Sequence, residues 1–197
     1  VEAAAAAGVK QFVFVSASMA DAASPVPFLA AKGKTEQLLM AGTMPYTILA
    51  PDAFMDLWLG VIVGVPALRG LPVTLVGTGE RKHSFIASRD VVAYATAVVD
   101  NPAAHNRRLL FGGPAGVSYL EVVETFGRVL GRALAVHHVA PGEPIPGVPD
   151  AVIPLAASFD LYDAVLPGQE LADEFGVRLT TVEQFARAMV GQGAVRE

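Results

Sequence analysis

The chain has 197 residues, of which 53% are hydrophobic and 17% charged, and its formal net charge is −5. This composition supports one well-buried core, excludes a disordered chain, and argues against nucleic-acid binding. Cysteine is absent, which rules out disulfides and thiolate metal sites, and the apolar stretch 57–68 contains Pro66 and is short for a membrane span.

The first fifty residues predict a crossover unit of a parallel sheet. Residues 1–7 favour a helix ending at Gly8, and the apolar run 12–15 predicts a strand. A helix over 28–40 and a second apolar strand over 46–49 follow. Because strands that are apolar on both faces belong inside parallel sheets, this order predicts an α/β fold.

The next segment predicts a less regular lobe. Residues 54–68 are apolar and partly helical in pattern, although Gly60 and Gly64 weaken the helix. The runs 73–76 and 83–86 flank Gly77-Thr78-Gly79-Glu80, which predicts a hairpin.

Helix caps and prolines organise the remaining chain. Asp90 is predicted to cap a helix over 91–99, and capping boxes at Ser118 and Thr180 mark two further helix starts. The remaining predicted elements are a strand over 107–111, helices over 122–130, 156–166 and 185–190, and a proline-rich loop over 141–154.

Four motifs in chain order carry a resemblance to a known family. They are Phe12-Val-Phe-Val-Ser-Ala-Ser18, Lys32-x-x-x-Glu36, Pro45-Tyr-Thr-Ile-Leu-Ala-Pro51 followed by Phe54-Met55, and Phe85-Ile-x-x-x-Asp90. Together they resemble the NmrA-like group of atypical short-chain dehydrogenases. Leu130-Gly131-Arg132 and Phe175-Gly176-Val177 agree with it, so the likeness spans nearly the whole chain.

The resemblance implies a Rossmann-like parallel sheet with a small α+β substrate lobe. Residues 1–52 would be the second half of a dinucleotide-binding domain, and residues 53–197 a substrate lobe interwoven with the remaining Rossmann elements. The family begins with a strand followed by a glycine-rich turn that holds the pyrophosphate, and this strand-and-turn pair does not occur in the sequence. With no initiating methionine and no signal-peptide pattern, the sequence reads as the middle of a longer cytoplasmic polypeptide.

Candidate catalytic residues follow the strands, where ligands of open α/β sheets bind. By resemblance Lys32 lies beside the nicotinamide and ribose of NADP or NAD, and Ser16 or Ser18 orients a carbonyl. Alternatively Lys32 is a solvated helix lysine spaced four residues from Glu36, and the serines only satisfy loop backbone groups. Related reductases carry a tyrosine four residues before the lysine, where this chain has Phe28.

The remaining site residues also come from the resemblance. The predicted cofactor-binding set is Ser16, Ala17, Lys32, Ala50, Pro51 and Phe54, with Ala50 in place of a common arginine. Phe28, Met55 and Trp58, together with Leu57, would line an apolar substrate pocket. Core packing explains the residues after Pro51 nearly as well, and Pro51 itself could simply end a strand.

Two functions of different classes remain open for the whole protein. One is an NAD(P)-dependent reductase acting on a small, largely apolar carbonyl or enol-type compound. The other is a non-catalytic NAD(P)-binding redox sensor that acts through a protein partner, and a fragment that binds nothing is a third reading. No metal is expected, since His137 and His138 are adjacent and would face opposite ways in a strand. Nucleic acid and membrane are not expected partners, and the sequence leaves a homodimer open.

Overall fold

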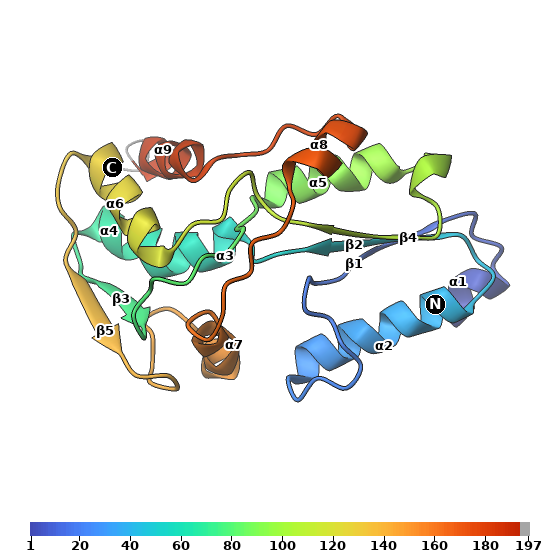
Figure 1. Ribbon diagram of the computed structural model, residues 1–197, viewed down its shortest axis with the longest axis horizontal. Helices are drawn as coiled ribbons and strands as arrows, with labels where there is room; N and C mark the ends of the chain where they lie inside the picture. Colours follow the sequence, from blue (N-terminus) through green and yellow to red (C-terminus); the bar gives the residue numbers. More distant parts are fainter. Residues whose placement is uncertain (194–197) are drawn as a thin grey trace.

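The computed structural model, which describes residues 1–193, contains a three-stranded parallel sheet (Figure 1). Its order is β1 (Phe12–Val15), β2 (Tyr46–Pro51) and β4 (Arg107–Phe111). Strand β1 pairs with β2 in the register that sets Phe12 beside Tyr46. The prediction of two neighbouring parallel strands is confirmed.

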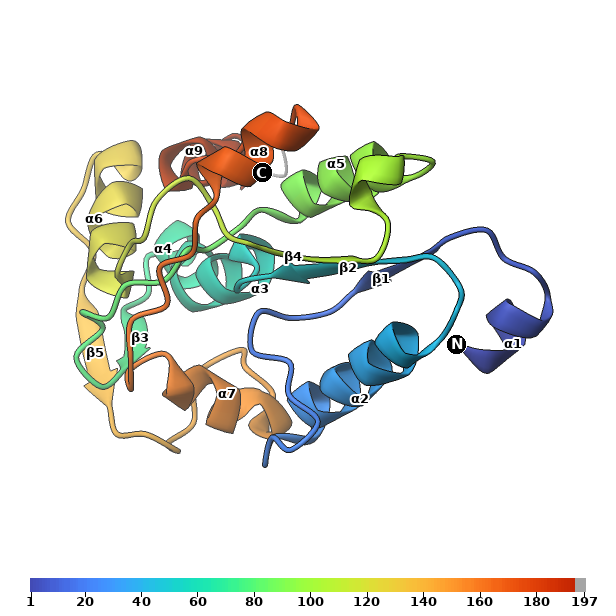
Figure 2. The same ribbon diagram turned by 45° about the vertical axis from the view of Figure 1, so that its right-hand side comes forward.

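Helices cover both faces of this sheet, as Figures 1 and 2 show. On one face lie α1 (Glu2–Ala6) and α2 (Pro27–Ala41), which pack around buried Leu39, Met44 and Ile48. On the other face lie α5 (Ser88–Val98) and α8 (Gln169–Phe175). The α/β class is confirmed, and the carboxyl ends of all three strands point toward the second lobe.

The second lobe is built around one long helical segment and a small parallel sheet. The segment runs through α3 (Met55–Leu59), a π-helical turn (Gly60–Gly64) and α4 (Val65–Arg69). Strand β3 (Val73–Val76) pairs in parallel with β5 (Val136–Val139). The lobe also contains α6 (Tyr119–Leu130), α7 (Ile153–Ser158), α9 (Val182–Gly193) and a short 3-10 turn at Asp150–Val152, while another 3-10 turn at Pro102–Ala104 connects α5 to β4.

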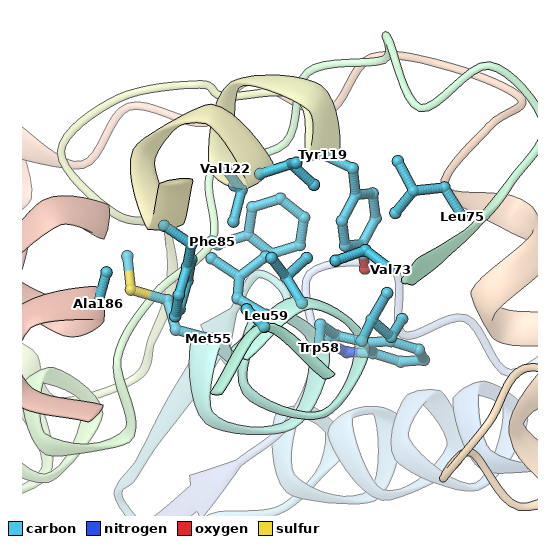
Figure 3. Close-up of a cluster of buried hydrophobic side chains, with 14 of the residues drawn as sticks. Met55, Trp58, Leu59, Val73, Leu75, Phe85, Tyr119, Val122 and Ala186 are labelled. Carbon is cyan, nitrogen blue, oxygen red and sulfur yellow. The ribbon is translucent and has the colours of Figure 1, made fainter. Parts of the chain in front are cut away.

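A large apolar core holds this lobe together (Figure 3). Met55, Leu59 and Phe85 lie inside it with Tyr119 and Val122 from α6. Each is at most 8% exposed. No helix among residues 1–193 is long and apolar enough to cross a bilayer.

The predicted hairpin between 73–76 and 83–86 is wrong. Gly77 and Gly79 do turn the chain, with φ of 60° and 70°, but β3 hydrogen-bonds to β5 instead. His83 makes only isolated bridges, to Val117 and Ala164. The glycines do form a turn, but the strand that pairs with β3 lies about sixty positions further along the chain.

Two predicted helix boundaries also need correction. The predicted helix over 156–166 stops at Ser158, where α7 ends. The capping box at the last helix starts one residue later than predicted. Thr181 Oγ1 accepts from the Gln184 amide, and Gln184 Oε1 accepts from the Thr181 amide. The box at Ser118 is confirmed.

Asp90 is not an N-cap, because α5 begins at Ser88 and Ala87 precedes it. Its buried carboxylate instead accepts hydrogen bonds from the Thr180 amide and hydroxyl, both at 2.7 Å. These bonds join α5 to the segment that leads into α9. A cap is a local arrangement, whereas this contact spans ninety residues.

Asp90→Asn is expected to lower the free energy of unfolding by about 2 kcal/mol, because one Thr180 donor then faces an amide NH2 group. Urea denaturation followed by circular dichroism measures the change. An unchanged midpoint would show that the Asp90–Thr180 contact does not stabilise the fold. Asp150→Asn is the control, since Asp150 is exposed.

Candidate functional site

A cavity of about 330 Å³ opens at the carboxyl ends of β1 and β2. Its walls come from the loop after β1, the start of α2, the residues that follow β2, and α7 with the loop behind it. The lining includes Ser16, Ala17, Ser18, Met19, Phe28, Pro51, Asp52, Phe54, Leu57, Trp58, His83, Phe159 and Tyr162. Most of the lining is apolar, which suits a small organic ligand.

Most predicted site residues meet at this cavity. Ser16, Ala17 and Ser18 line one wall, and Pro51 and Phe54 line the adjacent one. Phe28, Leu57 and Trp58 complete the apolar part. The segments after two adjacent parallel strands are therefore brought together, as the crossover topology requires.

Met55 and Ala50 do not line the cavity. Met55 is 1% exposed and points into the core of the second lobe (Figure 3). Ala50 is fully buried within β2. Met55 and Trp58 lie one turn apart on the same face of α3, and of the two only Trp58 reaches the cavity.

Lys32 is not among the residues that line the cavity. Its ammonium donates a 2.7 Å hydrogen bond to the Val15 carbonyl and sits over the rings of Phe14 and Phe28, 4.9 and 5.5 Å from their centroids. Burial lowers the pKa of Lys32. Among residues 1–193 Lys32 forms no ion pair with Glu36, whose carboxylate pairs with Arg108 instead.

Ser16 supplies a free polar group at the end of β1. Its hydroxyl oxygen is buried and has no hydrogen-bond partner within residues 1–193, although its amide donates to Leu49. A buried hydroxyl without a partner costs stability unless a ligand satisfies it. Together with the two remaining Lys32 N–H groups, it fits the polar nicotinamide and ribose end of a dinucleotide.

Asp52 is a charged lining residue that the sequence reasoning missed. It is 7% exposed, and its carboxylate accepts from the Ser18 hydroxyl at 3.2 Å and the Ser84 amide at 3.0 Å. Burial raises the pKa of Asp52, while His83 and hydrogen bonds from Ala53, Ser18 and Ser84 act to lower it. Its place next to Pro51, at a strand end, could have identified it.

His83, Phe159 and Tyr162 form a second group that the sequence reasoning missed. His83 Nε2 lies 2.9 Å from the Phe159 carbonyl and must carry hydrogen there, because a carbonyl only accepts. The Phe159 ring contacts His83 and Trp58, with centroids 4.8 and 4.7 Å apart. Burial is the main cause that raises the pKa of Tyr162, so its hydroxyl stays protonated.

An ion pair between the partly buried Arg108 and the buried Glu36 supports the loop that carries the two serines (the serine loop). Arg108 on β4 pairs with Glu36 on α2 at 2.8 Å and donates to the carbonyls of Ala17 and Ser18 at 3.1 and 3.2 Å. Glu36 is only 4% exposed. One guanidinium thus fixes a helix, a strand and the cavity loop together.

A parallel sheet covered by helices on both faces, with a pocket at its carboxyl edge, defines an α/β protein of the Rossmann class. The NmrA-like family model matches residues 1–183, and the chain belongs to that family.

Similar curated proteins carry different functions. The chain is 27% identical over 141 residues to the photosystem II assembly factor Ycf39 of Trieres chinensis, covering 71% of this chain and 43% of that protein. It is 30% identical over 132 residues to an NAD(P)H azoreductase of Xenophilus azovorans, covering 67% and 45%. The chain therefore spans less than half the length of these relatives.

Solved structures share the fold. An NADPH-dependent quinone oxidoreductase of Escherichia coli superposes with a TM-score of 0.76 at 19% identity, covering 95% of this chain and 70% of that one. A UDP-glucose 4-epimerase of Thermotoga maritima gives 0.73 at 18% identity, covering 99% and 67%. Reductases and epimerases are both represented, so the likeness specifies the architecture and no single reaction.

Proposed function

We propose that this chain forms the nicotinamide and substrate side of an NAD(P)-dependent reductase that acts on small, largely apolar carbonyl or enol-type compounds. One observation carries the proposal. The segments that follow two adjacent parallel strands share a single apolar cavity with Trp58 and Phe159. Membership of the NmrA-like family and the naming of two similar proteins as NADPH- or NAD(P)H-dependent enzymes support it.

The bound dinucleotide would supply hydride to the substrate. Ser16 and Lys32 would hold its nicotinamide and ribose end, and Ser18 would orient the substrate carbonyl. The aromatic wall would exclude water from the reacting carbon. Phe28 cannot give up a proton, so Lys32 or a water molecule held by the serines would provide it.

The test uses the whole natural protein, with NADPH and NADH and a panel of aromatic ketones, aldehydes and quinones. Loss of the absorbance of the reduced nicotinamide reports turnover. Lys32→Ala should lower kcat about 100-fold without changing the unfolding midpoint. Lys34→Ala, an exposed neighbour on the same helix, is the matched control.

A non-catalytic regulator that binds NAD(P) is the second candidate, and Phe28 favours it. This side chain lines the cavity at the place of a catalytic tyrosine and offers no hydroxyl. Dinucleotide binding without turnover on any compound, unchanged in Lys32→Ala, would support the regulator and contradict the reductase. Failure to bind either dinucleotide would contradict both.

A further inference from the structure

The cavity has an unusual charge distribution for a nucleotide-linked site. Among the lining residues within positions 1–193, Asp52 is the one carboxylate, and none is a lysine or an arginine. The other titratable lining groups are His83 and Tyr162. Burial raises the pKa of Asp52, and His83 and three hydrogen-bond donors oppose that rise by favouring the charged form. An anionic ligand would therefore meet the Asp52 carboxyl group and no lysine or arginine side chain.

Nearby cations are held outside the cavity. Lys32 is bound to the Val15 carbonyl, and Arg108 is paired with Glu36; neither lines the cavity. The Phe28 side of the cavity already has a positive group at its back, 5.5 Å from the ring centroid. A positive ligand group is thus directed away from Phe28 and toward Asp52, the one lining carboxyl group among residues 1–193.

Aromatic rings line the cavity together with Asp52. The indole of Trp58 stands edge-on to Phe159, and the His83 ring lies between Phe159 and Tyr162, with centroids 4.8 and 6.0 Å away. Faces of tryptophan, tyrosine and phenylalanine attract cations, and more strongly where water is excluded. A buried carboxylate next to such rings is the arrangement that recognises an organic ammonium or iminium group.

We propose that the cavity binds aromatic organic cations, either protonated amines or iminium ions, with the positive nitrogen beside Asp52 and the ring against Trp58 and Phe159. The cavity volume of about 330 Å³ accommodates a two-ring compound. The proposal names the class of ligand that the cavity binds. Only the hydride transfer to an iminium ligand rests on the proposed reductase function.

The chemical consequence concerns the missing tyrosine. When an iminium carbon accepts hydride from a reduced dinucleotide, a C–H bond forms and the C=N π electrons become the nitrogen lone pair. The substrate becomes a neutral amine and the dinucleotide is oxidised. No proton has to be delivered, so Phe28 at the tyrosine position is compatible with turnover.

The experiment measures binding to the chain without dinucleotide, by calorimetry and by the fluorescence of Trp58, the one tryptophan of the sequence. The probes are N-methylquinolinium, its neutral isostere 1-methylnaphthalene, and the anion 1-naphthoate. We expect the cation to bind about tenfold more tightly than the neutral probe and the anion most weakly. Equal or tighter binding of 1-methylnaphthalene, or no change in Trp58 fluorescence with any probe, overturns the proposal.

Asp52→Asn should remove the tenfold preference and leave the affinity for 1-methylnaphthalene unchanged. Asp56→Asn is the matched control, because Asp56 also accepts from a backbone amide, that of Ser88, and does not line the cavity. If a folded Asp52→Asn variant still prefers the cation, the placement of the positive nitrogen beside Asp52 is wrong. If the variant does not fold, the comparison of the three probes on the unaltered chain still tests the proposal. Dinucleotide binding and turnover are measured separately, so the reductase proposal can fail while cation binding holds, and the reverse.

Discussion

Arg108→Ala is expected to lower the free energy of unfolding by about 3 kcal/mol, because it leaves the buried Glu36 carboxylate without its cation. The same change removes the donors to the Ala17 and Ser18 carbonyls. The serine loop should then loosen, and probe binding at Trp58 should weaken together with stability. Urea denaturation and the fluorescence titration measure the two effects.

Arg107→Ala provides the matched control, one position earlier on the same strand. Arg107 pairs with Glu174, and both side chains are well exposed, at 38% and 42%. Exposed ion pairs stabilise little, so the unfolding midpoint should stay nearly unchanged. If Arg108→Ala and Arg107→Ala lower the free energy of unfolding equally, the loss comes from removing an arginine from β4 and not from breaking the Arg108–Glu36 pair.

Gly33→Ala is expected to destabilise the protein by about 3 kcal/mol. A methyl group there would lie 2.2 Å from the Ala22 amide nitrogen and 2.3 Å from the Asp21 carbonyl carbon. These are backbone atoms that cannot rotate away, so α2 must separate from the loop between β1 and α2. The gain in helix propensity is only about 1 kcal/mol and does not offset this.

Gly191→Ala is the control, since nothing lies within 4 Å of a methyl group at that position in α9. It should stabilise the protein slightly, by up to about 1 kcal/mol. Thermal unfolding of the two variants gives the contrast directly. Gly33→Ala should also weaken probe binding, because Met19 on the displaced loop lines the cavity. A stable Gly33→Ala variant would mean that the loop and α2 do not pack as closely as described.

The first sheet could be predicted because its signals are local. Phe12–Val15 and Tyr46–Leu49 are apolar on both faces, and the helix between them has a length that suits a right-handed crossover. Val136–Val139 was not identified as a strand, since His137 and His138 are exposed and break the apolar pattern. The partner of β3 therefore could not be found, and the nearby turn suggested the wrong one.

The cavity was predictable only on its strand side. Ser16, Ser18 and Pro51 follow strands, so the topology indicates where they meet. His83, Phe159 and Tyr162 reach the cavity from loops of the second lobe, and no local pattern distinguishes them from ordinary core residues. Likewise Asp90 has the chemistry of a cap, and only tertiary structure shows that it binds Thr180.

Strand β1 has one further consequence for the protein. Within residues 1–193 it pairs with β2 on one side alone, so a row of its backbone groups faces outward. Such a border readily accepts another strand, from the same polypeptide or from a neighbouring molecule. An added parallel strand would end beside Ser16, which lines the cavity. A strand that covers this edge would therefore both prevent another molecule from pairing with β1 and lie next to the opening through which a ligand enters.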